Sequence, residues 1–202
     1  MITDLTAQQQ DSLTELVNIA FGRAAAALSE LSGHRVLLSV PRVGIHSINQ
    51  LEVPLREISH GDVVSVHQVF TGPVAGSAIL MLNLEGALAL SALLTDDRVP
   101  LDRLDASDRE VLIEVGNIIL NACLGTFGNL LQVHISFSVP RMQLIALEGL
   151  LKSMVVDQLK MGYALLVATD FTLQDSTVSG CLVIILSVAS LEKLLEGVKL
   201  LG

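Results

Sequence analysis

Two pairs of polar side chains in this sequence have the types and the spacing to do chemistry on a bound partner. Glu15 precedes Asn18 by three residues, and Glu114 precedes Asn117 by three residues. A carboxamide donates and accepts hydrogen bonds but is not a base at neutral pH. Its catalytic task is therefore to hold a water in line, as a glutamine does in GTPases. A neighbouring carboxylate that is not needed as a base can pair with a cation on the partner.

The two pairs belong to an internal repeat. Pro41 follows Asn18 after 22 intervening residues, Pro140 follows Asn117 after the same number, and each proline stands in a Ser-Val-Pro-Arg tetrapeptide. At a usage of roughly 5% for one residue type, three fixed matches at a given offset arise about once in 10⁴ trials. Duplication explains the pattern. A single Glu-x-x-Asn would be an ordinary solvated helix face, whereas a pair that recurs at the same place in each repeat indicates function.

The rest of the sequence offers no self-contained active site. It has no Ser-His-Asp set, no Cys-His set, no glycine-rich phosphate loop and no Glu-x-x-His metal arrangement. Cys123 and Cys181 stand far apart without a Cys-x-x-Cys motif, so we expect buried free thiols and no zinc site. The five histidines are scattered, and we expect structural roles for them. The two pairs must therefore act on a site that a partner supplies, without a cofactor of the protein's own.

Composition favours a protein partner. The chain has 202 residues, 51% of them hydrophobic, which is ample for a buried core, and its net charge of −9 with only 12 Lys+Arg argues against nucleic-acid binding. No signal peptide follows Met1, so we expect a cytoplasmic protein. The apolar stretches 76–94 and 180–195 are interrupted by charged residues, and we interpret them as buried strands running into helices, without membrane insertion.

The first pair is predicted to lie on a long amphipathic helix. Apolar residues recur at intervals of three and four over 7–31, with an N-cap at Asp4 or Thr6 and an end at Gly33. The polar residues fall on one line that faces away from the apolar stripe. This first line consists of Asp11, Glu15 and Asn18.

A second helix of the same kind is predicted over 108–131. Ser107 is its expected N-cap, with Glu110 three residues later closing a capping box. Its outer line consists of Glu110, Glu114, Asn117 and Asn121.

The remaining elements predict an α+β fold, an α/β sandwich-like arrangement in which a layer of helices packs on a sheet. Two pseudo-twofold related repeats (7–94 and 107–198, joined by a linker at 95–106) would share a largely antiparallel sheet packed against the two long helices. Segment 45–61 is expected to be irregular, and 144–159 fits strand or helix equally. The expected strands are 35–43, 63–71, 74–82, 133–142, 162–172 and 177–186, and the expected short helices are 84–94 and 188–198.

The doubled motif, Glu-x-x-Asn followed after 22 residues by proline, resembles that of the CheC phosphatases of bacterial and archaeal chemotaxis, whose relatives are CheX and the flagellar switch phosphatase FliY. The resemblance covers nearly the whole chain. It implies a CheC-like fold and dephosphorylation of the response regulator CheY, with Asn18 and Asn117 orienting the water that attacks the aspartyl phosphate. It also implies that Glu15 and Glu114 contact a conserved lysine of CheY, that the magnesium ion belongs to CheY, and that the receptor deamidase CheD is a second partner.

The two motifs differ in one position. The family prefers Asp or Ser four residues before the glutamate; Asp11 fits this preference, whereas Glu110 departs from it and puts equal activity of the two sites in question. Pro41 and Pro140 are expected to be structural, because proline cannot donate to a sheet ladder and marks a strand end at an edge. We expect a monomer with two sites.

The same resemblance supports a function of a different class. The flagellar switch protein FliM is similar in fold but lacks the motif, so the alternative hypothesis is a non-catalytic adaptor that binds CheD or the flagellar switch. A third hypothesis is a metal-independent homodimer without an assigned role. Retention of both Glu-Asn pairs favours the phosphatase.

Overall fold

The computed structural model describes residues 5–95, 104–157, 162–173 and 176–199. Four predicted features fall outside these ranges, wholly or in part. They are the Asp4 cap, residues 96–103 of the linker, residues 158–159 of segment 144–159 and residues 174–175 of the second hairpin turn.

The first long helix, α1 (Ala7–Ser32), begins and ends where its capping residues allow. Thr6 and Gln9 form a capping box, in which each side chain bonds the backbone N–H of the other residue. Gly33 ends the helix with a φ of 69°, a left-handed conformation that favours glycine. The predicted Thr6 cap and Gly33 end are therefore confirmed.

The second long helix, α4 (Ala106–Leu131), begins earlier than predicted. Its N-cap is Asp105, whose carboxylate accepts from the N–H of Asp108 at 3.0 Å, while Asp108 accepts from the N–H of Asp105 at 2.8 Å. Ser91 also donates to the buried Asp108 carboxylate at 2.6 Å. The prediction of Ser107 as cap and Glu110 as its box partner is wrong, because an Asp-x-x-Asp box with an additional buried donor lies just upstream.

The strands form one antiparallel sheet in which each repeat completes the other. The order is β1-β7-β8-β4-β3-β5, with β2 also pairing with β7 and β6 also pairing with β3. β1 corresponds to β5 of the other repeat, β2 to β6, β3 to β7 and β4 to β8. Exchanging the corresponding strands gives the same strand order, read from the opposite edge of the sheet. This symmetry places a pseudo-twofold axis between β4 and β8. The strands are β1 Val36–Leu38, β2 Arg42–Ser47, β3 Asp62–Thr71, β4 Gly76–Asn83, β5 Ser136–Phe137, β6 Arg141–Ala146, β7 Tyr163–Leu173 and β8 Ser176–Leu186.

The first strand of each repeat lies at an edge of the sheet and is broken in two. The sequence predicts single strands over 35–43 and 133–142, but β1 and β2 are separated at 39–41, and β5 and β6 at 138–140. Each gap holds the Ser-Val-Pro of the repeated tetrapeptide. Proline has no N–H to donate, so the ladder stops there and the prediction of a continuous strand is wrong.

Each repeat also contains a helix that the sequence either missed or left open. Segment 45–61, expected to be irregular, holds the end of β2, a 3-10 turn and α2; Pro54 fits the first turn of α2 because an N–H there would have no helical partner. Segment 144–159, left open between strand and helix, begins with the end of β6 and continues as α5. The bounds are η1 Ile48–Gln50, α2 Glu52–Ile58, α3 Leu84–Thr95, α5 Leu147–Asp157 and α6 Val188–Lys199.

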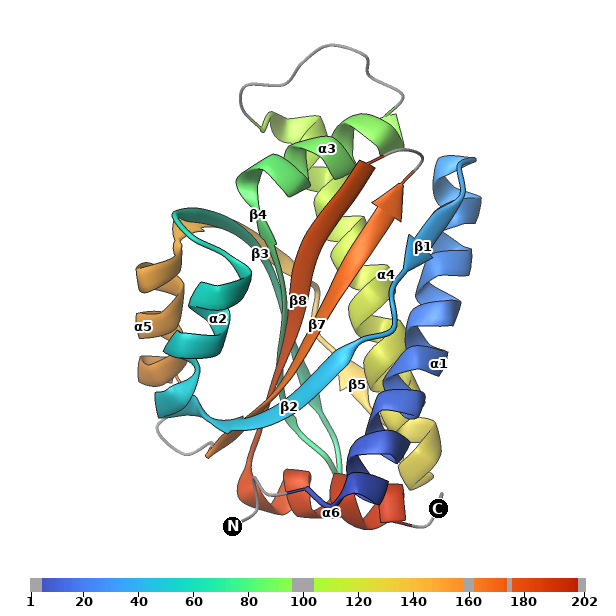
Figure 1. Cartoon of the computed structure of the whole chain (residues 1–202), viewed down its shortest axis with the longest axis vertical. Coiled ribbons are helices and arrows are strands. Elements are labelled where there is room, and N and C mark those ends of the chain that lie inside the picture. Colours follow the sequence, from blue (N-terminus) through green and yellow to red (C-terminus); the bar gives the residue numbers. More distant parts are fainter. Residues whose placement is uncertain (1–4, 96–103, 158–161, 174–175, 200–202) are drawn as a thin grey trace.

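Helices cover both faces of the sheet (Figure 1). α1 and α4 lie side by side over one face, with α3 near one end of this helix pair and α6 near the other, and together they enclose the larger hydrophobic core. η1, α2 and α5 cover the opposite face and enclose a second core. The sheet is therefore buried on both sides, whereas the sequence predicted only that the two long helices pack against it.

α4 and the two apolar stretches are part of these cores. α4 is long and apolar enough to cross a membrane, but 56% of its most apolar stretch is buried inside the fold, so we interpret it as a core helix. The stretches 76–94 and 180–195 are strands running into helices, as predicted. Cys123 and Cys181 are buried free thiols, which confirms that prediction.

Candidate functional site

The first Glu-Asn pair lies on the outer surface of α1. Leu16 and Val17, from the same turn, are buried in the larger core. Glu15 is exposed and Asn18 is partly exposed, with the exposed Asp11 one turn earlier. Because residues three and four apart share a helix face, these three polar side chains form a line that is open to solvent.

The second pair occupies the corresponding surface of α4 and is held by hydrogen bonds. Glu114 is exposed, Asn117 and Asn121 are partly exposed, and the exposed Glu110 lies one turn before Glu114. Asn117 Nδ2 donates to Glu114 Oε2 at 3.5 Å, and Asn121 Nδ2 donates to Asn117 Oδ1 at 2.8 Å. The three side chains thus form a continuous hydrogen-bonded row along the helix.

The structure does not bring the two pairs together. α1 and α4 run antiparallel (Figure 1), and Arg23 of α1 donates to Thr126 of α4 at 3.5 Å, which fixes their register. At a rise of 1.5 Å per residue, this register places Asn18 and Asn117 about 20 Å apart along the helix axes. The protein therefore presents two separate candidate sites, one near α6 and one near α3.

Both candidate sites are acidic. Asp11 and Glu15 precede Asn18 along the face of α1, and Glu110 and Glu114 precede Asn117 along the face of α4. Within the described residues, none of these four carboxylates forms an ion pair. Each asparagine therefore stands beside two exposed negative charges that are available to a cation on a partner.

The prolines of the motif lie behind the helices and have a structural setting. Pro41 is buried in the gap between β1 and β2, and Pro140 is partly exposed in the gap between β5 and β6. At the second gap, the N–H of Ser138 donates to the carbonyl of Val69 at 2.9 Å, and its Oγ accepts from the N–H of Val69 at 3.0 Å. The serine of the tetrapeptide thus continues the pairing that the proline interrupts.

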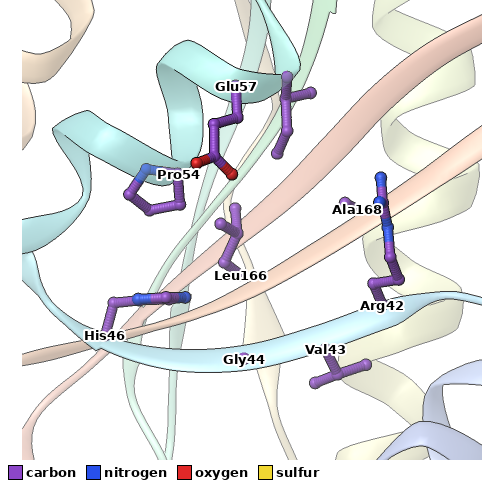
Figure 2. Close-up of a pocket in the computed structure, with 9 residues that line it drawn as sticks. Arg42, Val43, Gly44, His46, Pro54, Glu57, Leu166 and Ala168 are labelled. Carbon is purple, nitrogen blue, oxygen red and sulfur yellow. The ribbon is translucent and has the colours of Figure 1, made fainter.

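A pocket of about 340 Å³ lies away from both pairs (Figure 2). Arg42 and His46 of β2 and Glu57 of α2 line it, on the side of the sheet that α2 covers, and burial lowers the pKa of His46 below its ordinary value. None of the motif residues contributes to this pocket. Among the described residues, no cluster of three or more His, Cys, Asp or Glu could hold a metal ion. The candidate residues thus stand on solvent-exposed helix faces outside this pocket, where a macromolecule can reach them.

Sequence reasoning assigned no part in the sites to three residues beside the pairs. Ile19 directly follows Asn18 and is 45% exposed, which makes it an apolar contact surface within the first site. Ile118 likewise follows Asn117, but it is only partly exposed and also packs against the larger core, on whose side the sequence predicted it. The recurrence of the dipeptide Asn-Ile at the repeat offset is the signal that could have found them. The sequence placed Asn121 on the outer line of this helix, but nothing in the sequence pattern predicted its hydrogen bond to Asn117.

No protein-family model matches the chain, but its fold is similar to those of several solved structures. The chain is similar to FliY from Thermotoga maritima, with a TM-score of 0.75 at 19% identity over 98% of this chain and 99% of that chain. It is also similar to the FliM middle domain from H. pylori, with a TM-score of 0.63 at 12% identity over 96% and 99%. A third similar structure is the CheX-CheY-BeF3-Mg+2 complex from Borrelia burgdorferi, with a TM-score of 0.51 at 20% identity over 83% and 96%.

The chain has the CheC/CheX/FliY fold. The predicted fold class is thereby confirmed, including the antiparallel sheet shared between two pseudo-twofold related repeats. At these levels of identity the likeness establishes the CheC-like fold alone. What the fold does in this chain must be inferred from its own residues, above all from the two Glu-Asn pairs.

Proposed function

We propose that this protein is a two-site phosphatase that hydrolyses the aspartyl phosphate of a CheY-like receiver domain in the cytoplasm. The observation that carries the proposal is the presence of a Glu-Asn pair on the outer face of each long helix of a CheC-like fold. The solved complex of CheX with CheY supports a receiver domain as the partner. The separation of Asn18 and Asn117 along the two helices supports two sites that act independently within one chain.

In the proposed reaction, the asparagine positions the attacking water. The carboxamide oxygen accepts a hydrogen bond from a water that lies in line with the acyl phosphate, which lowers the entropic part of the barrier. A bond forms between the water oxygen and phosphorus, and the bond between phosphorus and the aspartyl oxygen breaks. The aspartate leaves with the electron pair of the broken bond, and the proton of the water passes to the phosphate product or to solvent.

The glutamates serve to hold the receiver domain. Glu15 and Glu114 are exposed and, among the described residues, in no ion pair, so each can form one with a lysine of the receiver. In this proposal the magnesium ion belongs to the receiver domain, where it neutralises the charge of the phosphoryl group. The chain's own residues supply binding and the orientation of the water.

The proposal is tested by measuring phosphate release from a phosphorylated receiver domain. Asn18→Ala and Asn117→Ala are each expected to remove the contribution of one site, and the double variant is expected to leave only the autohydrolysis rate of the receiver. Asn49→Ala is the matched control, because Asn49 is exposed in η1, which lies on the opposite face of the sheet from α1 and α4. A double variant that hydrolyses as fast as the wild type contradicts the proposal. A panel of phosphorylated receiver domains then identifies the target.

A second candidate function is that of a non-catalytic adaptor. It is favoured by the similarity to the FliM middle domain, which has been solved in complexes with FliG and with SpeE. On this alternative the helical faces or the sheet edges bind a component of the flagellar switch or CheD. Tight binding of either partner, together with an unchanged rate of receiver dephosphorylation when the protein is added, favours the adaptor over the phosphatase.

A further inference from the structure

The hydrogen-bonded row on α4 has a fixed direction. A carboxylate only accepts hydrogen bonds, so Glu114 requires the Nδ2 of Asn117 on its side. The Oδ1 of Asn117 must then face the other way, towards Asn121, whose Nδ2 donates to it at 2.8 Å. Glu114 and Asn121 together therefore determine which end of the Asn117 carboxamide is the acceptor.

The first site lacks this restraint. The position four residues after Asn18, which corresponds to Asn121, is Gly22. Within the part of the chain that the structure describes, the side chains of Glu15 and Asn18 make no hydrogen bond. The χ2 torsion of asparagine is broad and roughly twofold, so an unrestrained carboxamide exchanges the places of its donor and its acceptor.

Asn121 is not explained by stability. Its Oδ1 is buried and, among the described residues, has no hydrogen-bond partner. A buried acceptor without a partner destabilises the folded state, and an alanine at this position would avoid that cost. Asn121 thus lowers stability through its Oδ1, while its Nδ2 orients Asn117. A residue that costs stability in this way is typical of a functional site.

We propose that Asn121 is a positioning residue for Asn117. It fixes the Asn117 carboxamide so that the carboxamide oxygen can accept a hydrogen bond from the attacking water. The second site is therefore preorganised, whereas the first site is not. This inference rests on the proposed phosphatase function. Preorganisation acts on kcat, because it selects the orientation that is productive in the transition state and leaves docking of the receiver unaffected. The two sites are therefore expected to bind the receiver similarly and to turn it over at different rates.

The test uses the full chain in an Asn18→Ala background, in which only the second site works. Asn121→Ala is expected to lower kcat about tenfold with KM unchanged, since misplacement of a positioning group costs up to about 10²-fold in rate. Asn121→Asp keeps the shape of the side chain but cannot donate to Asn117 Oδ1, and is expected to lower kcat at least as much. Asn49→Ala is again the control and should change neither constant. Urea unfolding should show that Asn121→Ala is no less stable than its parent, whereas a purely structural role for Asn121 would make it less stable.

The reciprocal variant adds the restraint to the first site. A side chain at Gly22 would meet no atom within 4 Å of its Cβ, so Gly22→Asn is accommodated on the surface of α1. In an Asn117→Ala background, Gly22→Asn is expected to raise kcat several-fold. A first site that gains no rate contradicts the inference that this restraint separates the two sites.

The failure of this inference differs from the failure of the proposed function. If Asn18→Ala/Asn117→Ala abolishes phosphate release while Asn121→Ala and Asn121→Asp keep the kcat of their parent, the phosphatase stands and the role of Asn121 is refuted. An Asn18→Ala parent that has lost all activity also refutes it, because the second site should be the faster one. If the double asparagine variant is fully active, the proposed function itself is wrong.

Discussion

Ser138 exchanges two hydrogen bonds with the backbone of Val69 across the point where Pro140 interrupts the edge strand. Ser39 makes the equivalent exchange in the first repeat: its N–H donates to the carbonyl of Asp170 at 2.9 Å, and its Oγ accepts from the N–H of Asp170 at 2.9 Å. The serine hydroxyl thus replaces a backbone acceptor at the end of the ladder. This accounts for the serine that precedes the proline in both copies of the tetrapeptide.

Removing that hydroxyl is expected to destabilise the edge of the sheet. Ser138→Ala leaves the N–H of Val69 without its partner and should lower the free energy of unfolding by about 1 kcal/mol, with Ser39→Ala giving a similar loss. Ser136→Ala is the control: Ser136 is exposed in β5 and its side chain makes no hydrogen bond in the described part of the chain. Urea denaturation followed by circular dichroism measures the difference. Equal stability of Ser138→Ala and Ser136→Ala would show that the hydroxyl is not what closes the gap.

The sequence predicts the elements of the larger core well, because their apolar periods are regular. The 3.6-residue period over 7–31 and the alternation over 63–71 each correspond to an element observed within two residues of the predicted bounds. The repeat also predicts that the sheet is shared, since two copies of one plan pack most simply around a twofold axis.

Elements that depend on tertiary contacts were less predictable. The short helix α2 packs on the far face of the sheet through Leu55, and seven residues carry too short a period to distinguish a helix from a loop. The cap of α4 depends on Ser91, which is distant in sequence from Asp108. In the site, helical spacing places Glu114 and Asn117 on one face, but the direction of their hydrogen bonds follows only from the structure.

Two glycines of α4 are expected to respond oppositely to alanine. Gly116 faces β3, and a Cβ there would stand 2.7 Å from the Cβ of Val66, a stiff and buried side chain. Gly116→Ala should therefore destabilise the fold by about 1–3 kcal/mol through overpacking. At Gly125 an added Cβ would meet no atom within 4 Å, so Gly125→Ala should stabilise the helix by up to about 1 kcal/mol. Thermal or urea unfolding of the two variants checks this, and a stabilising Gly116→Ala would contradict the close approach of α4 to the sheet.

The two cysteines are expected to be inert in the folded protein. Burial raises the pKa of Cys181 to about 12 and raises the pKa of Cys123 further above its ordinary value. Because the thiolate is the reactive form, a disulfide reagent at pH 8 should modify neither thiol in the native protein and both after denaturation. The raised pKa values also predict how stability depends on pH. Above about pH 9 the two thiols ionise in the unfolded chain but stay protonated in the folded protein, so the free energy of unfolding falls as the pH rises. A native thiol that reacts as fast as free cysteine would contradict the packing around it.

Removing the charge of Glu15 and removing the charge of Glu114 are expected to change different kinetic constants. In an Asn117→Ala background, Glu15→Gln removes one exposed charge and should raise KM for the phosphorylated receiver about twofold to fivefold at unchanged kcat, the range expected for an exposed ion pair. In an Asn18→Ala background, Glu114→Gln should raise KM and also lower kcat, because an amide at 114 no longer dictates the direction of the Asn117 carboxamide. Glu57→Gln is the control, because Glu57 is exposed on α2, which covers the opposite face of the sheet from α1 and α4. Steady-state phosphate release at two salt concentrations measures these effects, since the loss of an ion pair also weakens the dependence of KM on salt. A Glu15→Gln variant with lower kcat and an unchanged KM would mean that the glutamate acts on the reaction and not on docking.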